Sequence, residues 1–298
     1  MDIEQQFLNS ADENNLLKAE SRKLTAKVCE ICPHHCRLNA GEIGKCRARY
    51  NDGEKITALN YGRLTSIALD PIEKKPLYRF FPGSMILSVG SFGCNLNCPF
   101  CQNYEISMAD YNFPTRQLSP AELVKIAVDL RDRKNIGVAF TYNEPFISYE
   151  YVRDTSALLK EIGLKSVLVT NGTVASGALK KILPLIDAMN IDLKGFSQNI
   201  YDVLGGDFET VKNTIQTAAQ SCHVEVTTLI VPRMNDSESD MDAESKWLAS
   251  ISKDIPLHVS RFFPRYKVTD RPPTDVKLVY RLADVARRNL NFVYTGNC

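Results

Sequence analysis

The sequence has no long hydrophobic run. Its longest apolar stretches, such as 137–140 and 229–232, fall far short of the roughly 18 residues that span a bilayer. Residues 1–20 are acidic and polar, whereas a secretory signal needs a basic start followed by an apolar segment. We therefore expect a soluble, cytoplasmic protein without a membrane partner.

Net charge is also nearly absent. Lys and Arg together number 36 and Asp and Glu 35, which leaves a formal charge of +1. A chain with so little net charge has no overall field that draws it to nucleic acid or to an anionic membrane surface. We expect neither as a partner, although a local basic patch is compatible with this balance.

Cysteine, by contrast, is plentiful. Seven of the nine cysteines fall into two tight groups, at 29–46 and 94–101. In the reducing compartment that we infer, disulfides are rare, so metal ligation explains this grouping better. Of the other two, Cys222 is expected to be a buried small apolar side chain. Cys298 is either a mobile thiol or a residue near the active site.

The two ends of the chain differ in pattern. Residues 1–23 are compatible with an amphipathic helix or a loosely held leader, and residues 24–84 are rich in Cys, Pro and charge. From residue 85 onward, short apolar segments alternate with helical periods, which is typical of βα units on a parallel sheet. We predict a small Cys-rich, metal-binding N-terminal appendage (1–84) and a larger domain (85–298).

The repeat predicts six βα units. Strands are expected at 85–91, 136–142, 165–170, 187–193, 224–231 and 256–262, with a last short strand at 292–294. Helices are expected near 119–133, 146–162, 175–185, 207–220, 238–252 and 273–289. The fold class is therefore α/β, a partial (βα)6 TIM-like barrel. Its functional residues should lie in loops at the carboxyl ends of the strands.

A few residues mark the boundaries of predicted helices and turns. Ser119 and Glu122 form a capping-box pattern around Pro120, which predicts the start of a helix. Gly163 is expected to end the next helix, and Gly172 to occupy a tight turn with positive φ.

Three cysteines follow the first barrel strand at the spacing Cys-x3-Cys-x2-Cys: Cys94, Cys98 and Cys101. Thiolates at short, fixed separations bind the iron corners of a [4Fe-4S] cluster, and three of them leave one iron open for a cofactor or substrate. The alternatives are a zinc site, which normally takes four ligands, or three buried cysteines.

This loop, with Phe100 before its third cysteine, resembles the radical S-adenosylmethionine superfamily. The resemblance implies that the open iron binds the amino and carboxylate groups of S-adenosylmethionine. One electron from the cluster then cleaves this cofactor to methionine and a 5'-deoxyadenosyl radical. The superfamily also has a partial (βα)6 barrel, in agreement with the six units counted above.

The same resemblance assigns cofactor contacts after the second and third strands. Asn143 and Glu144 stand where similar enzymes have a Gly-Gly-Glu segment that contacts the methionine amino group; the Glu is kept and the glycines are not. Thr170 and Asn171, followed by Gly172, match a Thr-Asn-Gly element of glycyl-radical activating enzymes. A helix-start turn and an ordinary Asn-Gly turn are the structural alternatives.

Further contacts are implied after the later strands. Asp192 and Lys194 match an Asp-Leu-Lys element, and His258 corresponds to a histidine near the ribose in pyruvate formate-lyase activating enzymes. A surface ion pair and a packed histidine are the alternatives. Arg233 and Asn235 either reach the cofactor or only shape their loop.

The second cysteine group comprises Cys29, Cys32, Cys36 and Cys46. Four ligands close a site: zinc would stabilise the fold of the segment, whereas a second [4Fe-4S] cluster would relay electrons or bind substrate. We favour a structural metal site and leave the metal open. The neighbouring His34 and His35 either replace a thiolate or are solvated.

Segments 70–84, 91–107, 141–145 and 293–298 together resemble the radical enzyme of the AmmeMemoRadiSam system, a relative of pyruvate formate-lyase activating enzymes. The resemblance implies an anaerobic oxidoreductase that takes electrons from a low-potential donor such as a flavodoxin or ferredoxin and abstracts hydrogen from a substrate the motifs do not identify. The alternatives are activation of a glycyl radical protein, which makes the substrate a protein, and a non-enzymatic zinc or iron-sulfur interaction protein.

Overall fold

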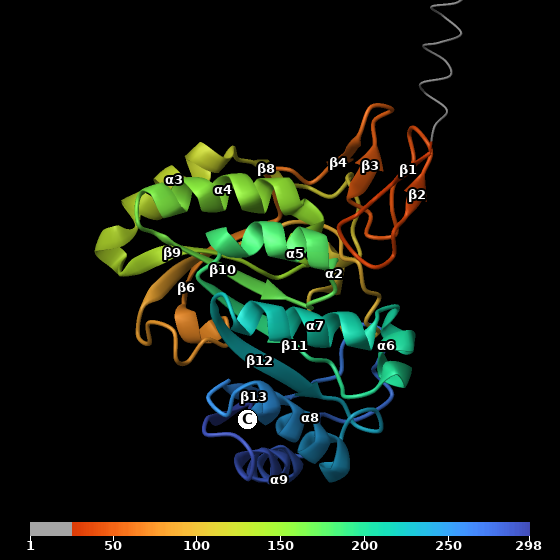
Figure 1. The fold of residues 1–298 in the computed structure, drawn as a ribbon, viewed down its shortest axis with the longest axis vertical. Coiled ribbons are helices and arrows are strands. Elements are labelled where there is room, and N and C mark those ends of the chain that lie inside the picture. The colour runs from red at the N-terminus through yellow and green to blue at the C-terminus, as the bar shows by residue number, and fades with distance from the viewer. Residues whose placement is uncertain (1–25) are drawn as a thin grey trace, which may run out of the picture.

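The computed structural model describes residues 26–298. The helix or leader expected over residues 1–23 lies outside the described residues. An eight-stranded sheet forms the centre, in the order β14-β13-β12-β11-β10-β9-β7-β6 (Figure 1). Its parallel strands are β7 (Met85–Gly90), β9 (Asn135–Phe140), β10 (Lys165–Thr170), β11 (Ala188–Asp192), β12 (His223–Ile230), β13 (Leu257–Arg261) and β14 (Val293–Gly296).

These seven strands confirm the prediction of a partial (βα)6 barrel, and each lies within two residues of its expected bounds. The eighth strand, β6 (Ser66–Pro71), was not predicted. It pairs antiparallel with β7, from Ser66 opposite Gly90 to Pro71 opposite Met85. The sheet remains open because β6 and β14 occupy its two ends.

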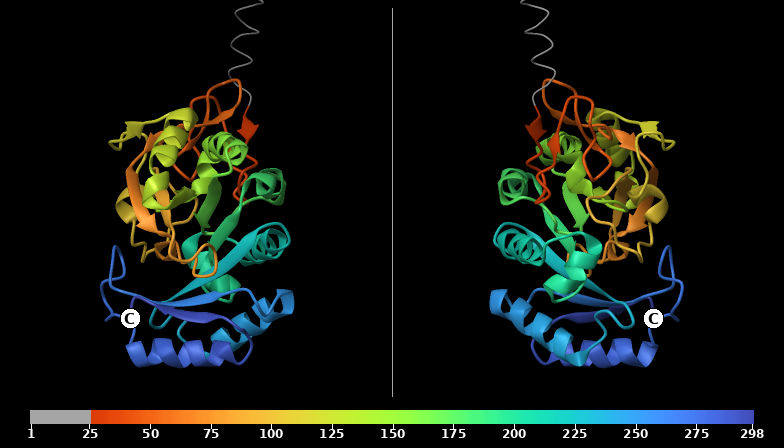
Figure 2. Two further views of the ribbon diagram at one scale, coloured as in Figure 1. Left: turned by 90° about the vertical axis from the view of Figure 1, so that its left-hand side faces the viewer. Right: turned by 90° about the vertical axis from the view of Figure 1, so that its right-hand side faces the viewer.

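Helices cover the outer face of this sheet (Figures 1 and 2). The expected ones are α3 (Pro120–Asp129), α4 (Tyr149–Glu161), α5 (Ser176–Ile182), α7 (Phe208–Ala219), α8 (Glu238–Ile251) and α9 (Val276–Arg287). Two others, α2 (Tyr104–Ser107) and α6 (Gln198–Leu204), were not predicted. Both lie at the carboxyl edge of the sheet (Figure 1).

The predicted boundary residues act as expected. The Ser119 hydroxyl accepts the Glu122 N–H at 3.3 Å, and the Glu122 carboxylate accepts the Ser119 N–H at 2.7 Å. This reciprocal pair satisfies two helix-end donors and starts α3. Gly163 and Gly172 both have φ of 71°, a conformation that favours glycine.

The two faces of the strands pack against different partners. Leu87, Val138, Leu168 and Met189 belong to the large apolar cluster that includes the helices. Alternate residues, including Ile86, Ala139 and Val167, instead pack with Ile72, Leu77 and Phe80 of the segment after β6. Because alternate residues of a strand face opposite sides, this segment fills the inside of the barrel.

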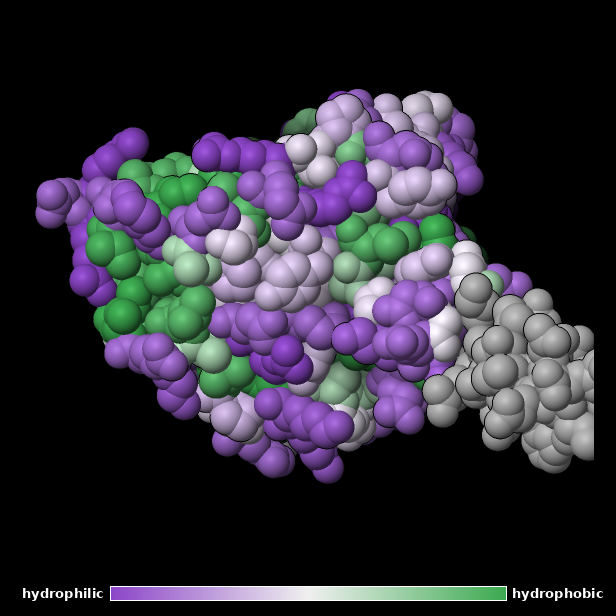
Figure 3. All heavy atoms as spheres, turned by 90° about the horizontal axis from the view of Figure 1, so that it is seen from above, coloured by the Kyte–Doolittle hydropathy of each residue, from purple (hydrophilic) through white to green (hydrophobic). Residues whose placement is uncertain are grey.

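The Cys-rich segment forms small hairpins beside the barrel. They comprise β1 (Lys27–Val28) with β2 (Arg37–Leu38), and β3 (Arg49–Asn51) with β4 (Ile56–Ala58). A further short pair joins β5 (Arg63–Leu64) to β8 (Arg116–Gln117). Seen from above, hydrophilic residues cover most of the surface and hydrophobic residues gather in separate areas (Figure 3). Among residues 26–298, no helix has both the length and the apolar character needed to cross a membrane.

Candidate active site

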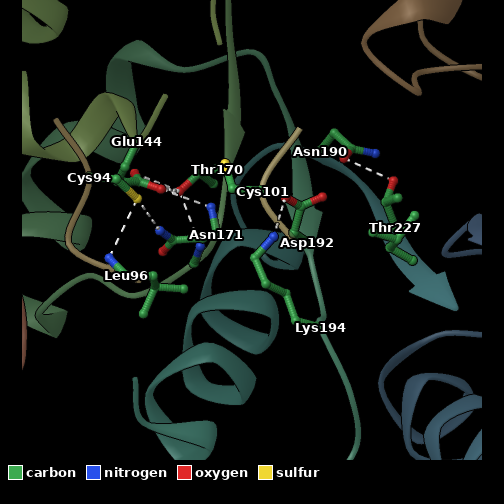
Figure 4. Close-up of polar contacts among 12 residues, drawn as sticks. Cys94, Leu96, Cys101, Glu144, Thr170, Asn171, Asn190, Asp192, Lys194 and Thr227 are labelled. Atoms are coloured by element: carbon green, nitrogen blue, oxygen red, sulfur yellow. Dashed lines mark hydrogen bonds and ion pairs between the residues drawn. The ribbon is translucent and has the colours of Figure 1, made fainter. Parts of the chain in front are cut away.

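The loop after β7 carries three cysteines over the carboxyl ends of the parallel strands. Cys94, Cys98 and Cys101 line a cavity of about 250 Å³ together with Phe100. Predicted residues from the next three loops share this cavity: Asn143, Glu144, Thr170, Asn171, Asp192 and Lys194. Figure 4 shows the side chains of several of these loops pointing toward one another. These residues follow the carboxyl ends of neighbouring parallel strands, and they line one cavity for that reason.

The Asn143 side chain holds the start of the cysteine loop through two hydrogen bonds. Its side-chain oxygen accepts the Ser91 N–H at 2.9 Å, and its amide nitrogen donates to the Gly93 carbonyl at 3.0 Å. Gly93 has φ of 85°, and a Cβ there would lie 2.5 Å from the Cys46 carbonyl oxygen. The loop path thus depends on one asparagine and one glycine.

Tyr142 is a cavity residue that sequence reasoning missed. It has φ of 69°, which is unusual for an aromatic residue. Its ring lies over Gly90, and its hydroxyl donates to Asp70 at 2.9 Å. Burial and the Asp70 carboxylate raise the pKa of Tyr142 to about 12.

Glu144 ties two loops together within the protein interior. Its carboxylate accepts the Phe146 N–H at 3.0 Å, the Asn171 N–H at 2.8 Å and the Thr170 hydroxyl at 2.8 Å. Burial raises the pKa of Glu144 to about 7, although these hydrogen bonds oppose the shift. A carboxylate has about four acceptor positions, so it keeps capacity for one further donor.

The cysteine sulfurs have a donor environment that suits metal binding. The Leu96 N–H donates to Cys94 Sγ at 3.4 Å, and the Asn171 amide lies 3.6 Å from the same sulfur. Burial raises the pKa of Cys94 and brings that of Cys98 to about 11. Bound cations favour thiolate over thiol, so one buried and two half-buried thiols, with N–H groups directed at the Cys94 sulfur, fit an iron-sulfur cluster.

Asp192 and Lys194 form an ion pair at the end of β11, with Lys194 Nζ 2.9 Å from Asp192 Oδ2. Burial works against the charge of Lys194, but Asp192 outweighs it and the pKa of Lys194 is raised. The Lys194 carbonyl accepts the Asn235 amide at 3.1 Å. Asn235 therefore shapes its loop, and Arg233 is exposed. The pair offers one cation and one carboxylate to a zwitterionic ligand.

The structure does not bring His258 to the cavity. Its Nε2 lies 2.6 Å from Glu225 Oε2, and Glu225 also contacts His223 Nε2 at 2.9 Å and accepts the Arg79 N–H at 2.7 Å. Burial opposes the charge of Glu225, but the hydrogen bonds from His223 and His258 prevail and lower its pKa to about 2. His258 thus helps hold the segment before β7 against β12 and β13.

The Cys-rich segment contacts the outer side of the cysteine loop. His34 Nε2 lies 2.8 Å from the Asn95 carbonyl oxygen. Arg47 donates to the Cys94 carbonyl at 3.2 Å and to the Asn97 side chain at 2.7 Å. Neither contact was predicted, because the partners are far apart in sequence and follow no local pattern.

Cys29, Cys32 and Cys46 are buried, and Cys36 is half-buried. Burial raises the pKa of Cys32 to about 11 and raises that of Cys46. Within the described residues, no three or more His, Cys, Asp or Glu side chains converge on a single-ion position. The cysteines at 29–46 are thus not arranged around one ion, whereas in a [4Fe-4S] cluster each cysteine binds a different iron. The two separate cysteines, half-buried Cys222 and exposed Cys298, do not line the cavity.

The sequence model of the Radical SAM superfamily matches residues 88–244, so the chain belongs to this superfamily of enzymes. Uncharacterized protein MJ0808 of Methanocaldococcus jannaschii is 40% identical over 274 residues, which cover 90% of this chain and 80% of that protein. The pyruvate formate-lyase-activating enzyme of Clostridium pasteurianum is 26% identical over 200 residues, 65% of this chain and 80% of that enzyme. Membership implies a [4Fe-4S] cluster and S-adenosylmethionine as cofactors.

Solved structures share the fold. A radical SAM methyltransferase from Sphaerobacter thermophilus aligns with a TM-score of 0.56 and 15% identity, covering 72% of this chain and 67% of that one. Streptococcus suis SuiB aligns with a TM-score of 0.56 and 13% identity, over 70% of this chain and 48% of that one. At these identities the likeness concerns the partial barrel alone.

Proposed function

We propose that this chain cleaves S-adenosylmethionine reductively at a [4Fe-4S] cluster held by Cys94, Cys98 and Cys101, and that the radical produced takes hydrogen from a substrate. The supporting observation is that the three cysteines share one cavity with Glu144 and the Asp192–Lys194 pair. When bound, the cluster supplies the single electron for this cleavage.

The chain's own residues bind and orient the cofactor, and they exclude water from the site. Lys194 is placed to meet a carboxylate, and Asp192 and Glu144 to meet an ammonium or hydroxyl. Thr170 and Asn171 hold Glu144 in place through their hydrogen bonds. Phe100 packs with Leu96 and other apolar residues behind the cysteines, which keeps water from that side of the site.

We further propose that the substrate is a protein or a peptide. The similarity to pyruvate formate-lyase activating enzymes favours glycyl radical activation of a partner protein as a second candidate. SuiB, which shares the barrel, has been solved bound to the precursor peptide SuiA. Both relatives support a protein or peptide substrate over a small molecule. A low-potential electron donor such as a flavodoxin or ferredoxin belongs to the same proposal.

The N-terminal cysteine group is proposed as a structural metal site, with zinc or a second [4Fe-4S] cluster as its occupant; zinc would require the thiols to move closer together, because their described positions do not converge on one ion. Three of its four thiols are buried, and the segment lies against the cysteine loop through His34 and Arg47. Metal binding there would stabilise a segment that has little regular structure of its own.

Anaerobic reconstitution tests these proposals together. The chain is loaded with iron and sulfide, reduced with dithionite and given S-adenosylmethionine, and iron and 5'-deoxyadenosine are measured. We expect deoxyadenosine, with iron of about four per chain for one cluster or about eight for two. A fully loaded chain that forms no deoxyadenosine would overturn the proposed function.

A further inference from the structure

A basic and aromatic hairpin follows β13 and lies against the cysteine loop. Arg265 and Val268 exchange backbone hydrogen bonds at 3.1 Å in both directions, which forms a tight turn with Tyr266 and Lys267 at its tip. The Lys267 N–H donates to the Pro99 carbonyl at 2.9 Å. Pro99 stands between two cluster cysteines in sequence, so one hydrogen bond joins the tip of the hairpin to the loop. In Figure 2 the blue segment between β13 and α9 extends beyond the sheet.

The hairpin is held in a defined conformation. Tyr266 has φ of 55°, and its ring stacks on Tyr104 with centroids 4.6 Å apart and an interplanar angle of 14°. Tyr104 begins α2, three residues after Cys101. Val268 packs in the apolar cluster that contains Cys98. A non-glycine residue in the left-handed region persists only where its surroundings enforce it, and such strain concentrates at functional sites.

Two of the three cations on and beside the hairpin lack a carboxylate partner among the described residues, and the third has a distant one. Among the described residues, no carboxylate lies within 4.0 Å of the charged groups of Arg261 or Lys267. Arg265 reaches Glu105 at 4.0 Å and leaves 48% of its side chain exposed. This local surplus contrasts with the chain's formal charge of +1.

We propose that this face docks an acidic redox protein that passes electrons to the cluster. We call it the basic hairpin face; it consists of Tyr104, Arg261, Phe263, Arg265, Tyr266 and Lys267. The inference rests on the proposed radical chemistry, which needs one electron per cleavage. In the docked complex the donor is oxidised by one electron and the [4Fe-4S] cluster is reduced from the 2+ to the 1+ state.

Three properties favour a redox protein over other occupants. The hairpin is bonded to the segment that carries Cys98 and Cys101, so a protein seated there lies beside the cluster. Tyr and Arg are the residues enriched where proteins bind one another. Redox encounters use small interfaces and are accelerated by opposite charge, which suits a face of a few cations and rings.

The test compares two reductants on the full, reconstituted chain. Stopped-flow absorbance follows cluster reduction by reduced bacterial flavodoxin, an acidic protein, and by dithionite, a small molecule. The variant Arg265→Glu/Lys267→Glu reverses two exposed charges on the face. Lys180→Glu/Lys181→Glu makes the same change in charge on exposed residues of α5.

We expect Arg265→Glu/Lys267→Glu to slow reduction by flavodoxin at least tenfold at low ionic strength. The effect should shrink as salt is added, because screening removes electrostatic steering. Reduction by dithionite, iron content and deoxyadenosine formed with dithionite should equal those of the wild type. The α5 variant should behave as the wild type with both reductants.

Each contrary outcome has a distinct meaning. An unchanged rate with flavodoxin, and with a ferredoxin as second donor, would overturn the docking proposal while leaving the radical chemistry intact. If the reversed variant lost affinity for an acidic peptide but its cluster was still reduced by flavodoxin at the wild-type rate, the face would be assigned to substrate binding instead. Absence of deoxyadenosine from the loaded wild type with dithionite would overturn the proposed function itself. If the reversed variant loses iron, Arg265→Gln/Lys267→Gln replaces it and should show a smaller loss of flavodoxin rate.

Discussion

The Glu144 carboxylate accepts the Asn171 backbone N–H at 2.8 Å, so the loops after β9 and β10 are joined beneath the cysteine loop. The Asn171 amide in turn donates to the Asn95 side chain at 2.9 Å. Asn95 follows Cys94 directly. The position of the cysteines is therefore coupled to the two neighbouring loops through side chains that also face the cavity.

Glu144→Gln should weaken S-adenosylmethionine binding and reduce stability by about 1–3 kcal/mol, because an amide group would face donors that now have an acceptor. Isothermal titration of the cofactor into the reconstituted enzyme measures the first effect, and urea unfolding the second. The matched control, Glu161→Gln on the exposed surface of α4, should leave both unchanged. Wild-type affinity in Glu144→Gln would contradict the assignment.

Cys98→Ser should abolish deoxyadenosine formation and lower bound iron by about four per chain, since a hydroxyl does not replace a thiolate on the cluster. Iron assay and chromatography of the nucleoside product give the two readings. Cys222→Ser alters a half-buried thiol outside both cysteine groups and should keep the full iron content. A Cys98→Ser protein that retains iron and turnover would remove this residue from the ligand set.

Acid sensitivity should depend on Glu225. Its pKa falls from the ordinary 4.5 to about 2 in the folded chain, so its contribution to stability is present above pH 4.5 and is lost as pH falls toward 2. The shift corresponds to roughly 3 kcal/mol. Glu225→Gln should be less stable than the wild type at pH 7. The difference in free energy of unfolding between the two proteins should narrow by about that amount on acidification. Urea unfolding of the metal-free, reduced chain across this range measures it; a constant gap would contradict the prediction.

Gly137→Ala should disrupt the sheet. A Cβ there would lie 1.9 Å from the Lys165 carbonyl oxygen, which belongs to the backbone of the paired strand β10. We expect a loss of at least about 3 kcal/mol or failure to fold. Gly177→Ala in α5 meets nothing within 4 Å and should be neutral or stabilising by up to about 1 kcal/mol. Thermal unfolding compares the pair, and equal stability of the two variants would show that β9 and β10 separate easily.

Periodicity located the parallel strands because they are buried and bounded by turn residues. It missed β6, whose six residues are all only half-buried and which ends at Pro71. An edge strand of this kind has no continuous apolar run or clean alternation. Its place in the sheet follows from pairing with β7, which is a tertiary property.

The site was predictable where residues follow strand ends. Glu144, Asn171 and Lys194 share the cavity for that reason. The role of Asn143 was not predictable, because its amide is used by the loop that it supports. His258 was assigned by resemblance, and its hydrogen bond to Glu225 depends on a neighbouring strand.

Contacts with the segment before residue 85 indicate that the barrel does not fold independently of it. A truncated chain starting at residue 85 would lack β6 and the Arg47 bond to the Cys94 carbonyl. It would expose the unpaired edge of β7 and the apolar inside of the barrel that Leu77 and Phe80 now fill. Exposed strand edges and apolar surface promote association between chains. We expect such a fragment to aggregate. The segment before residue 85 therefore protects the barrel from self-association by covering its strand edge and its apolar interior.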